Sequence, residues 1–206
     1  MKRGRRFWWA NIASFLLFAG FVLQIAACKA VVKENQPSEK EPDGDSAKQP
    51  LTINELKNAE YRSKWSARGK IKLDDGNYQE KIAPDSATEL VIKLSDKVAF
   101  GDLNGDGAED AAVMLICDPG GSGTFYELVA VINSKGKPQH AASVFLGDRL
   151  KVEEVDISSG QIVVKMVIHQ PSDPRCCPSL KVEQKYALHG DSLVRQPVEK
   201  KTGERR

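Results

Sequence analysis

The sequence predicts a mainly β domain: an antiparallel meander of seven to nine strands, curled over a core, with one short helix at its N-terminal end. Runs of β-branched and apolar residues alternate with clusters of Gly, Asp, Asn and Pro, which is the pattern of strands and turns. The connections are too short for the helical crossovers that parallel strands require. No repeat with a period of roughly 20–50 residues is present, which excludes a propeller or a solenoid. An α+β arrangement is the alternative.

The helix is predicted over residues 52–61, at the start of the domain. Thr52 and Glu55 have the spacing of a capping box, in which the two side chains satisfy backbone N–H groups of the first turn. Leu56 and Ala59 follow and supply apolar side chains that can pack against the sheet.

Strands are predicted wherever β-branched and apolar residues cluster. Each run borders residues that favour turns, because Gly, Asn and Asp tolerate positive φ or bond to their own backbone. The predicted strands are 69–73, 88–94, 110–117, 125–133, 161–169 and 180–188. The predicted turns are Asp75-Gly76, Ser95-Asp96, residues 118–123, residues 134–138, Ser159-Gly160 and residues 189–191.

The first 27 residues predict an export signal. Four basic residues precede an apolar stretch over 10–27, and the stretch ends in small residues before Cys28. The sequence Ile-Ala-Ala-Cys resembles the lipobox of bacterial lipoproteins, in which the cysteine is diacylated and becomes the new N-terminus. The alternatives are an uncleaved anchor, since about 18 apolar-leaning residues can just span a bilayer, and plain secretion.

Cleavage and lipidation at Cys28 would place the chain in the bacterial cell envelope, attached to the membrane through its lipid. An aspartate directly after the cysteine retains bacterial lipoproteins in the inner membrane, whereas Lys29 occupies that position here. The resemblance therefore favours the outer membrane, facing the periplasm, in a cell that has two membranes.

The rest of the chain divides into a tether, one domain and a tail. Residues 28–50 and 198–206 are rich in charged and polar residues, which cannot bury enough apolar surface to offset the entropy of ordering. Both segments are predicted to be disordered. Residues 51–197 have the length of a single domain with a hydrophobic core of its own.

The charge of the mature chain argues against nucleic-acid binding. The full chain has 30 basic and 28 acidic residues, and the signal contains four of the basic and none of the acidic ones. Removal of the signal leaves 26 basic residues against 28, a formal charge of −2. The basic isoelectric point thus comes from the segment that is removed, and no nucleic-acid partner is expected.

The sequence DLNGDGAED, residues 102–110, is the clearest candidate for a metal site. Asp102, Asn104, Asp106 and Asp110 place oxygen ligands at positions 1, 3, 5 and 9 of a tightly turned loop, and the carbonyl of Ala108 can add another. Such spacing suits calcium, although position 12 lacks the glutamate of an EF-hand. The loop is similar to the strand-flanked calcium loops of the FG-GAP type. The alternative is a solvated turn between strands.

Residues 118–126 do not predict a catalytic site. A phosphate-binding glycine loop precedes a helix, whereas a strand follows this one. A nucleophile elbow needs glycine two residues after the serine, and Thr124 follows Ser122 at that distance. The three histidines are isolated from one another in the sequence. No catalytic residue is assigned, and a hairpin loop is predicted here.

The cysteines predict one disulfide in an oxidising compartment. With Cys28 lipidated, Cys117, Cys176 and Cys177 remain, and three thiols allow three alternative pairings. Cys117 ends an apolar strand and can be a buried free thiol. The alternative is a soft-metal or thiol-redox site, in which Cys176 and Cys177 act with His169 and Met166 toward copper(I) or zinc.

Several motifs together resemble a domain of uncharacterised bacterial lipoproteins and exported proteins. They are VAFGDLNGDGAEDAAV, GGSGTFYELVAV, ASVFLGDR and DPRCCP, and the likeness covers residues 55–195. The same motifs are also similar, more loosely, to those of the mycobacterial LppP/LprE lipoproteins. The resemblance implies export and a β-rich domain, carries no activity, and favours a bond between Cys176 and Cys177.

The expected function is a non-enzymatic binding or structural module of the envelope. Its partner would be an envelope protein or a glycan, and calcium is the one cofactor that the sequence suggests. The alternative is an envelope copper, zinc or redox protein that works through Cys176 and Cys177.

Overall fold

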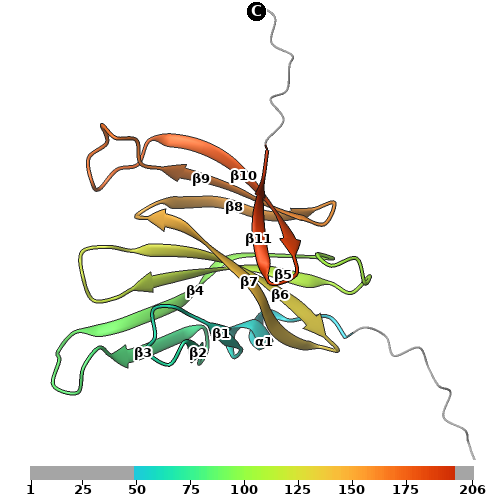
Figure 1. The fold of residues 1–206 in the computed structure, drawn as a ribbon, viewed down its shortest axis with the longest axis horizontal. Coiled ribbons are helices and arrows are strands. Elements are labelled where there is room, and N and C mark those ends of the chain that lie inside the picture. The colour runs from blue at the N-terminus through green and yellow to red at the C-terminus, as the bar shows by residue number, and fades with distance from the viewer. Residues whose placement is uncertain (1–48, 198–206) are drawn as a thin grey trace, which may run out of the picture. The chain divides into compact units, whose positions relative to one another are not determined.

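The structure, a computed structural model, describes residues 49–197, and these belong to one compact unit. Eleven strands form three sheets, and one short helix precedes them in the chain (Figure 1). Every pairing between neighbouring strands is antiparallel. The mainly β prediction is therefore confirmed. The predicted signal, the predicted lipidation site Cys28, most of the tether and the whole of the tail lie outside the described residues.

The five-stranded sheet has the order β3-β4-β5-β6-β7, and the four-stranded sheet has the order β11-β10-β9-β8. A small hairpin of β1 and β2 forms the third sheet. The elements are α1 (Ile53–Lys57), β1 (Glu60–Arg62), β2 (Lys70–Lys72), β3 (Asn77–Lys81), β4 (Glu89–Gly101), β5 (Asp110–Asp118), β6 (Phe125–Ser134), β7 (Lys137–Asp148), β8 (Lys151–Ser158), β9 (Gln161–Ile168), β10 (Leu180–His189) and β11 (Ser192–Gln196).

The antiparallel meander is also confirmed, because β3 to β7 and β8 to β11 each pair in chain order, and the structure divides these strands into separate layers. Alternate residues of β5 enter two different cores: Val113 and Leu115 contribute to one, and Ala112 and Met114 to the other. The first core lies against α1, β1 and β2, and the second lies against β9, β10 and β11. A strand that is covered on both faces is apolar throughout, which explains the unbroken apolar run of β5.

The helix is shorter than predicted, although its capping box is present. The N–H of Glu55 donates to Thr52 Oγ1 at 3.2 Å, and the N–H of Thr52 donates to Glu55 Oε2 at 2.7 Å. The helix ends at Asn58, and residues 60–62 leave the helical path to pair with β2. This pairing buries Tyr61, whose hydroxyl donates to the carbonyl of Leu56 at 2.8 Å.

Ser95-Asp96 does not form the predicted turn, because β4 continues through it. The pairing of β4 with β5 changes register between Leu94 and Val98, so the residues between them form a bulge. The N–H of Lys97 donates to Ser95 Oγ at 3.2 Å, which satisfies a backbone group that the ladder leaves unpaired. The side-chain chemistry that predicted a turn therefore supports a bulge inside one long strand.

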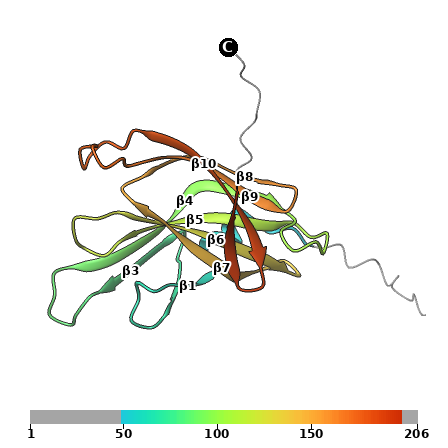
Figure 2. The same ribbon diagram turned by 45° about the horizontal axis from the view of Figure 1, so that its top comes forward.

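Three other predicted turns are tight reversals: those at residues 135–136 and 159–160 join paired strands, and Asp75-Gly76 closes the isolated bridge between Asp74 and Asn77. Asp75, Lys135 and Ser159 have φ values of 43°, 56° and 52°, and a glycine with positive φ follows each of them. Two consecutive residues with positive φ are the geometry of the type I′ turn, which matches the twist of a β-hairpin. Figure 2 shows the β10–β11 hairpin reaching across β7, and residues of β11 and β7 are in contact.

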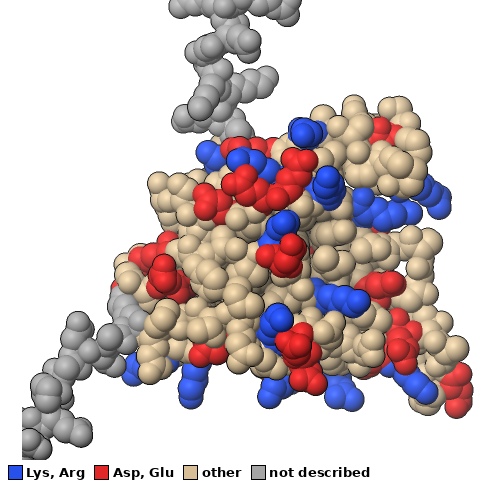
Figure 3. All heavy atoms as spheres, turned by 180° about the vertical axis from the view of Figure 1, so that it is seen from behind, with Lys and Arg blue, Asp and Glu red and all other residues tan. Residues whose placement is uncertain are grey.

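Charges of both signs are interspersed over the surface. On the face seen in Figure 3, Lys and Arg side chains lie beside Asp and Glu side chains. Several of them form exposed ion pairs, among them Lys165 with Glu154 at 2.7 Å and Lys70 with Glu60 at 3.2 Å. Exposed pairs of this kind contribute little to stability, because water and salt screen the attraction between the charges.

Candidate functional site

The predicted calcium loop connects β4 to β5 and is closed by its own side chains. Asp102 follows the end of β4, and its carboxylate accepts N–H bonds from Asn104 at 3.2 Å, Gly105 at 2.7 Å and Gly107 at 2.8 Å. These bonds keep the pKa of Asp102 below its usual value, and the bond from Gly107 contributes most. The two glycines have φ values near 80°, which the turn requires and which other residues rarely adopt.

Asn104 and Asp106 continue the same pattern further along the loop. The N–H of Asp106 donates to Asn104 Oδ1 at 2.9 Å, and the N–H of Ala108 donates to Asp106 Oδ1 at 2.7 Å. The amide of Asn104 also donates to Asp106 Oδ2 at 3.1 Å. The exposed oxygens of this loop are therefore held in place by the backbone before any ligand binds.

Asp110 has a different environment from the other loop residues. It is fully buried, its Oδ2 accepts the N–H of Leu103 at 2.9 Å, and its Oδ1 accepts the N–H of Asn133 at 2.9 Å. Burial raises the pKa of its carboxyl, and these two bonds oppose that increase. Asn133 in turn binds the carbonyl of Glu109 at 3.1 Å. Asp110 thus ties the loop to the far end of β6.

The structure brings the predicted ligands into one loop but does not test calcium binding. Asp102, Asn104 and Asp106 are exposed or half-buried, whereas Ala108 and Asp110 are buried. Over residues 49–197, no group of three or more His, Cys, Asp or Glu side chains is placed to hold a metal ion. Calcium at this loop stays a prediction.

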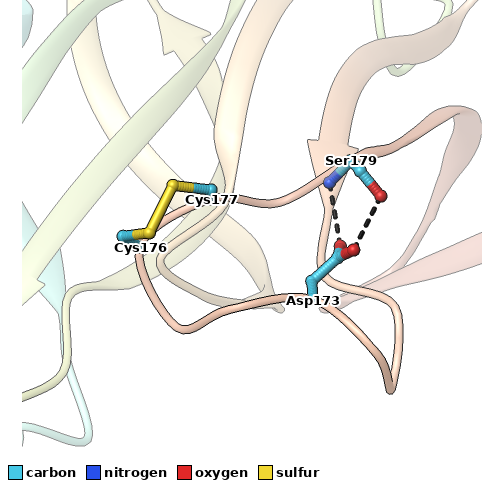
Figure 4. Close-up of a disulfide and its surroundings, with 4 residues drawn as sticks. All are labelled: Asp173, Cys176, Cys177 and Ser179. Carbon is cyan, nitrogen blue, oxygen red and sulfur yellow. Dashed lines mark hydrogen bonds between the residues drawn. A yellow bond between two sulfur atoms is a disulfide. The ribbon is translucent and has the colours of Figure 1, made fainter.

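The cysteine loop lies between β9 and β10. Cys176 and Cys177 are joined by a disulfide between adjacent residues, with their Cα atoms 3.8 Å apart (Figure 4). Asp173 organises the loop, because its carboxylate accepts the N–H of Gln170 at 2.8 Å and both the N–H and the hydroxyl of Ser179, at 2.9 and 2.8 Å. Both cysteines are exposed.

The structure does not gather the predicted soft-metal ligands. Met166 lies in the second core and is 1% exposed, while Cys176 and Cys177 lie on the exposed loop. Cys117 is a buried free thiol in β5. In this bonded state neither Cys176 nor Cys177 offers the thiolate that a soft metal requires.

Alkylation should distinguish the three cysteines of the domain. In native, unreduced protein we expect no modification, because Cys117 has no exposed surface and burial raises its pKa to about 12. Denaturant alone should release one reactive thiol, Cys117, and denaturant with reductant should release three. Mass spectrometry with peptide mapping measures this, and alkylation of Cys176 or Cys177 before reduction would contradict the pairing.

A cavity of about 450 Å³ lies where β1 and its following loop meet β6 and β7, and the sequence did not predict it. Glu127 of β6 is 6% exposed, and its Oε1 accepts the hydroxyl of Ser143 at 2.6 Å. Its Oε2 is buried and has no hydrogen-bond partner. The residues that line the cavity are Arg62, Ser63, Lys64, Gly69, Glu127, His140, Ser143, Phe145 and Asp191.

His140 links β1 to β7 at the wall of this cavity. Its Nδ1 accepts the backbone N–H of Arg62 at 3.2 Å, so the proton of the neutral ring is on Nε2. The Arg62 side chain donates to the carbonyl of Ala141. Burial, and secondarily the charge of Arg62, lowers the pKa of His140 to about 4. The ring is therefore uncharged at neutral pH.

Phe145 lines the cavity and belongs to a cluster of three aromatic rings. Trp65 stacks on Phe125 with ring centroids 4.7 Å apart, and Phe125 lies 6.1 Å from Phe145. The ammonium of Lys64 is 4.5 Å from the centroid of Phe145 and 5.2 Å from that of Trp65. These are cation–π distances. They hold Lys64 at the mouth of the cavity.

One signal in the sequence could have pointed to this cavity. Glu127 is a lone charged residue within the apolar run FYELVAVIN. Buried charges are rare unless they are paired, so a glutamate at an inward position of a strand indicates a function or a fixed partner. Its hydrogen-bond partner Ser143 lies on the next strand, and Arg62 and His140 line the same cavity from more distant parts of the chain, so no local pattern could have gathered them.

Comparison with protein-family models, curated proteins and solved structures finds no match to this chain. The resemblance to exported lipoprotein domains therefore rests on its motifs alone and stays a prediction. Among residues 49–197, no helix is long and apolar enough to cross a membrane.

Proposed function

We propose that the chain is a lipid-anchored protein of the bacterial cell envelope and that its β domain is a non-enzymatic binding module. The N-terminal sequence, with its lipobox-like end at Cys28, supports the anchor. A mature chain with near-neutral charge and an interspersed surface supports a partner other than nucleic acid.

The observation that carries the binding function is the cavity with Glu127 in its wall. Its volume of about 450 Å³ falls within the range of small-molecule sites, roughly 300–1,000 Å³. A buried carboxylate oxygen without a partner costs stability, and a bound ligand that donates a hydrogen bond to it would remove that cost. The alternative of a copper or zinc site at the cysteines has no comparable support, because their sulfur atoms are bonded to each other and offer no thiolate.

Native mass spectrometry tests the binding function. Full chain extracted from its own envelope with a mild detergent should carry a non-covalent compound, and Glu127→Gln should carry less of it. Glu154→Gln is the matched control, because Glu154 is an exposed glutamate of β8 whose partner is Lys165. Equal loading of all three proteins would contradict a binding site at this cavity.

Cys28→Ser tests the anchor. The variant should lack the mass of the acyl chains and move from the detergent phase to the aqueous phase, because its sulfur is gone and no lipid can be attached. Mass spectrometry and phase partitioning measure both effects. Unchanged mass and partitioning would contradict lipidation, and an intact N-terminus would then support an uncleaved anchor.

We also propose that calcium binds at residues 102–110 and stiffens the domain. The alternating oxygen ligands and their fixing by backbone N–H groups support this proposal. Exported domains meet calcium at roughly millimolar concentration, so a site with a dissociation constant of about 10⁻⁴ M would be largely filled.

Asp106→Ala tests the calcium proposal. Calcium at a hundredfold excess over its dissociation constant should stabilise the original domain by about 2.7 kcal/mol, which a melting curve detects. The variant should lose this response because one charged ligand is gone, while Asp96→Ala, at an exposed aspartate outside the loop, should keep it. Identical melting curves of the original domain in calcium and in chelator would show that the loop is only a turn.

A further inference from the structure

We propose that the cavity lined by Glu127 binds a small zwitterion, namely an amino acid or a short peptide. The ligand ammonium would donate to Glu127, and the ligand carboxylate would be bound by Lys64 and Arg62. The inference rests on the proposed binding function and adds the class of ligand.

The ammonium half follows from the unpartnered oxygen of Glu127. A carboxylate oxygen accepts hydrogen bonds. Ser143 donates to Oε1 from β7 at 2.6 Å, whereas Oε2 is buried in the wall of the cavity without a partner, so the Glu127 carboxylate would turn toward the cavity to bind the ligand. A donor with positive charge is the strongest match for such a group, since charge-assisted bonds are about twice as strong as neutral ones.

The carboxylate half follows from the two cations at the rim. Over residues 49–197, neither Lys64 nor Arg62 forms an ion pair with a carboxylate. The Lys64 ammonium is held instead over the rings of Phe145 and Trp65. A lysine side chain is long and rotatable, so it can turn from the rings toward an anion.

The charge balance of the cavity favours a ligand that has both signs. Arg62 and Lys64 contribute two positive charges, Glu127 and Asp191 contribute two negative ones, and His140 is neutral at pH 7. A cavity with zero net charge attracts neither a polyanion nor a polycation strongly. A zwitterion is complementary to separated charges of opposite sign, and Phe145, 45% exposed, offers it an apolar surface.

Calorimetry on the full chain in a mild detergent with defined probes tests the proposal. The probes are the twenty standard amino acids and alanyl-alanine in its L and D forms, with glucose and N-acetylglucosamine as probes that are not zwitterions. For each compound that binds, we then titrate two derivatives, one with the amino group acetylated and one with the carboxylate amidated. We expect at least one zwitterion to bind with a dissociation constant of about 1 mM or lower, and each derivative to bind about tenfold more weakly, which corresponds to about 1.4 kcal/mol.

Two variants separate the halves of the site. Glu127→Gln should weaken the free zwitterion about tenfold and leave the acetylated derivative unchanged, because that derivative has no ammonium. Lys64→Ala, at an exposed position, should also weaken the free zwitterion about tenfold. It should leave the amidated derivative unchanged, because that derivative has no carboxylate. Glu154→Gln is the control for both.

Failure of this inference differs from failure of the binding function. Binding of glucose or N-acetylglucosamine that Glu127→Gln abolishes, with no binding of any zwitterion, would overturn the ligand class and leave the binding site in place. Zwitterion affinity that neither acetylation nor amidation lowers would also overturn it. No binding of any probe at roughly millimolar concentration, with no compound carried by the native chain, would overturn both.

Discussion

Replacing Asp110 with alanine is expected to lower the free energy of unfolding by roughly 3–5 kcal/mol in calcium-free buffer. The Asp110 carboxylate is fully buried and accepts two backbone N–H groups, those of Leu103 and Asn133, at 2.9 Å each. A hydrogen bond to a charged group contributes about 1.5–3 kcal/mol, and alanine would leave both donors buried without partners. Denaturant titration of original and variant domains measures the difference.

Asp110→Asn and Asp106→Ala complete this experiment. Asparagine keeps one acceptor oxygen but turns an N–H₂ group toward a backbone N–H. Asp110→Asn should therefore recover only part of the unfolding free energy that Asp110→Ala loses. Asp106 belongs to the same loop but is exposed, so its removal without calcium should cost less than about 1 kcal/mol. Equal stability of Asp110→Ala and the original domain would refute the structural role of Asp110.

Acid should destabilise the domain through His140 by about 3 kcal/mol between pH 6.5 and pH 4. Burial lowers the pKa of His140 to about 4 in the folded chain, against about 6.5 when unfolded. The unfolded chain therefore binds the proton first. The stability that the neutral ring contributes is complete above pH 6.5 and is lost as pH falls toward 4.

His140→Asn should remove this part of the pH dependence. Asparagine does not titrate and retains an oxygen that can accept the N–H of Arg62, while it loses the edge contact with Tyr61. Its unfolding free energy should be lower at pH 7 and should change less from pH 7 to pH 4. His189→Asn, at an exposed position, should follow the original domain. If the unfolding free energy of His140→Asn changed with pH as steeply as that of the original domain, the lowered pKa of His140 would be refuted.

The local features of this fold were predictable because neighbouring residues determine them. The capping box of Thr52 and Glu55 and the turns at Asp75, Lys135 and Ser159 depend on backbone preferences within about four residues. The mainly β class follows from the same information. The loop at 102–110 was also recognisable, because all of its side-chain oxygens come from nine consecutive residues.

The errors lie where contacts with distant residues outweigh local preference. Residues 60–62 would extend the helix, but pairing with β2 buries Tyr61 and fixes them as a strand. Ser95-Asp96 has the chemistry of a turn, yet the ladder with β5 resumes on its far side. The division into layers depends on both faces of β5 being covered, which no window of sequence can indicate.

The sequence by itself therefore determined the β class, the turn positions other than Ser95-Asp96, the export signal as a prediction, and the ligand pattern of the 102–110 loop. Only the tertiary structure decided that Asp110 binds the backbone of Asn133, 23 residues away. Only it brought Arg62 and His140 together with Glu127 around one cavity. The bond between Arg62 and His140 joins strands of different sheets, and the packing of those sheets is a property of the whole core rather than of any segment.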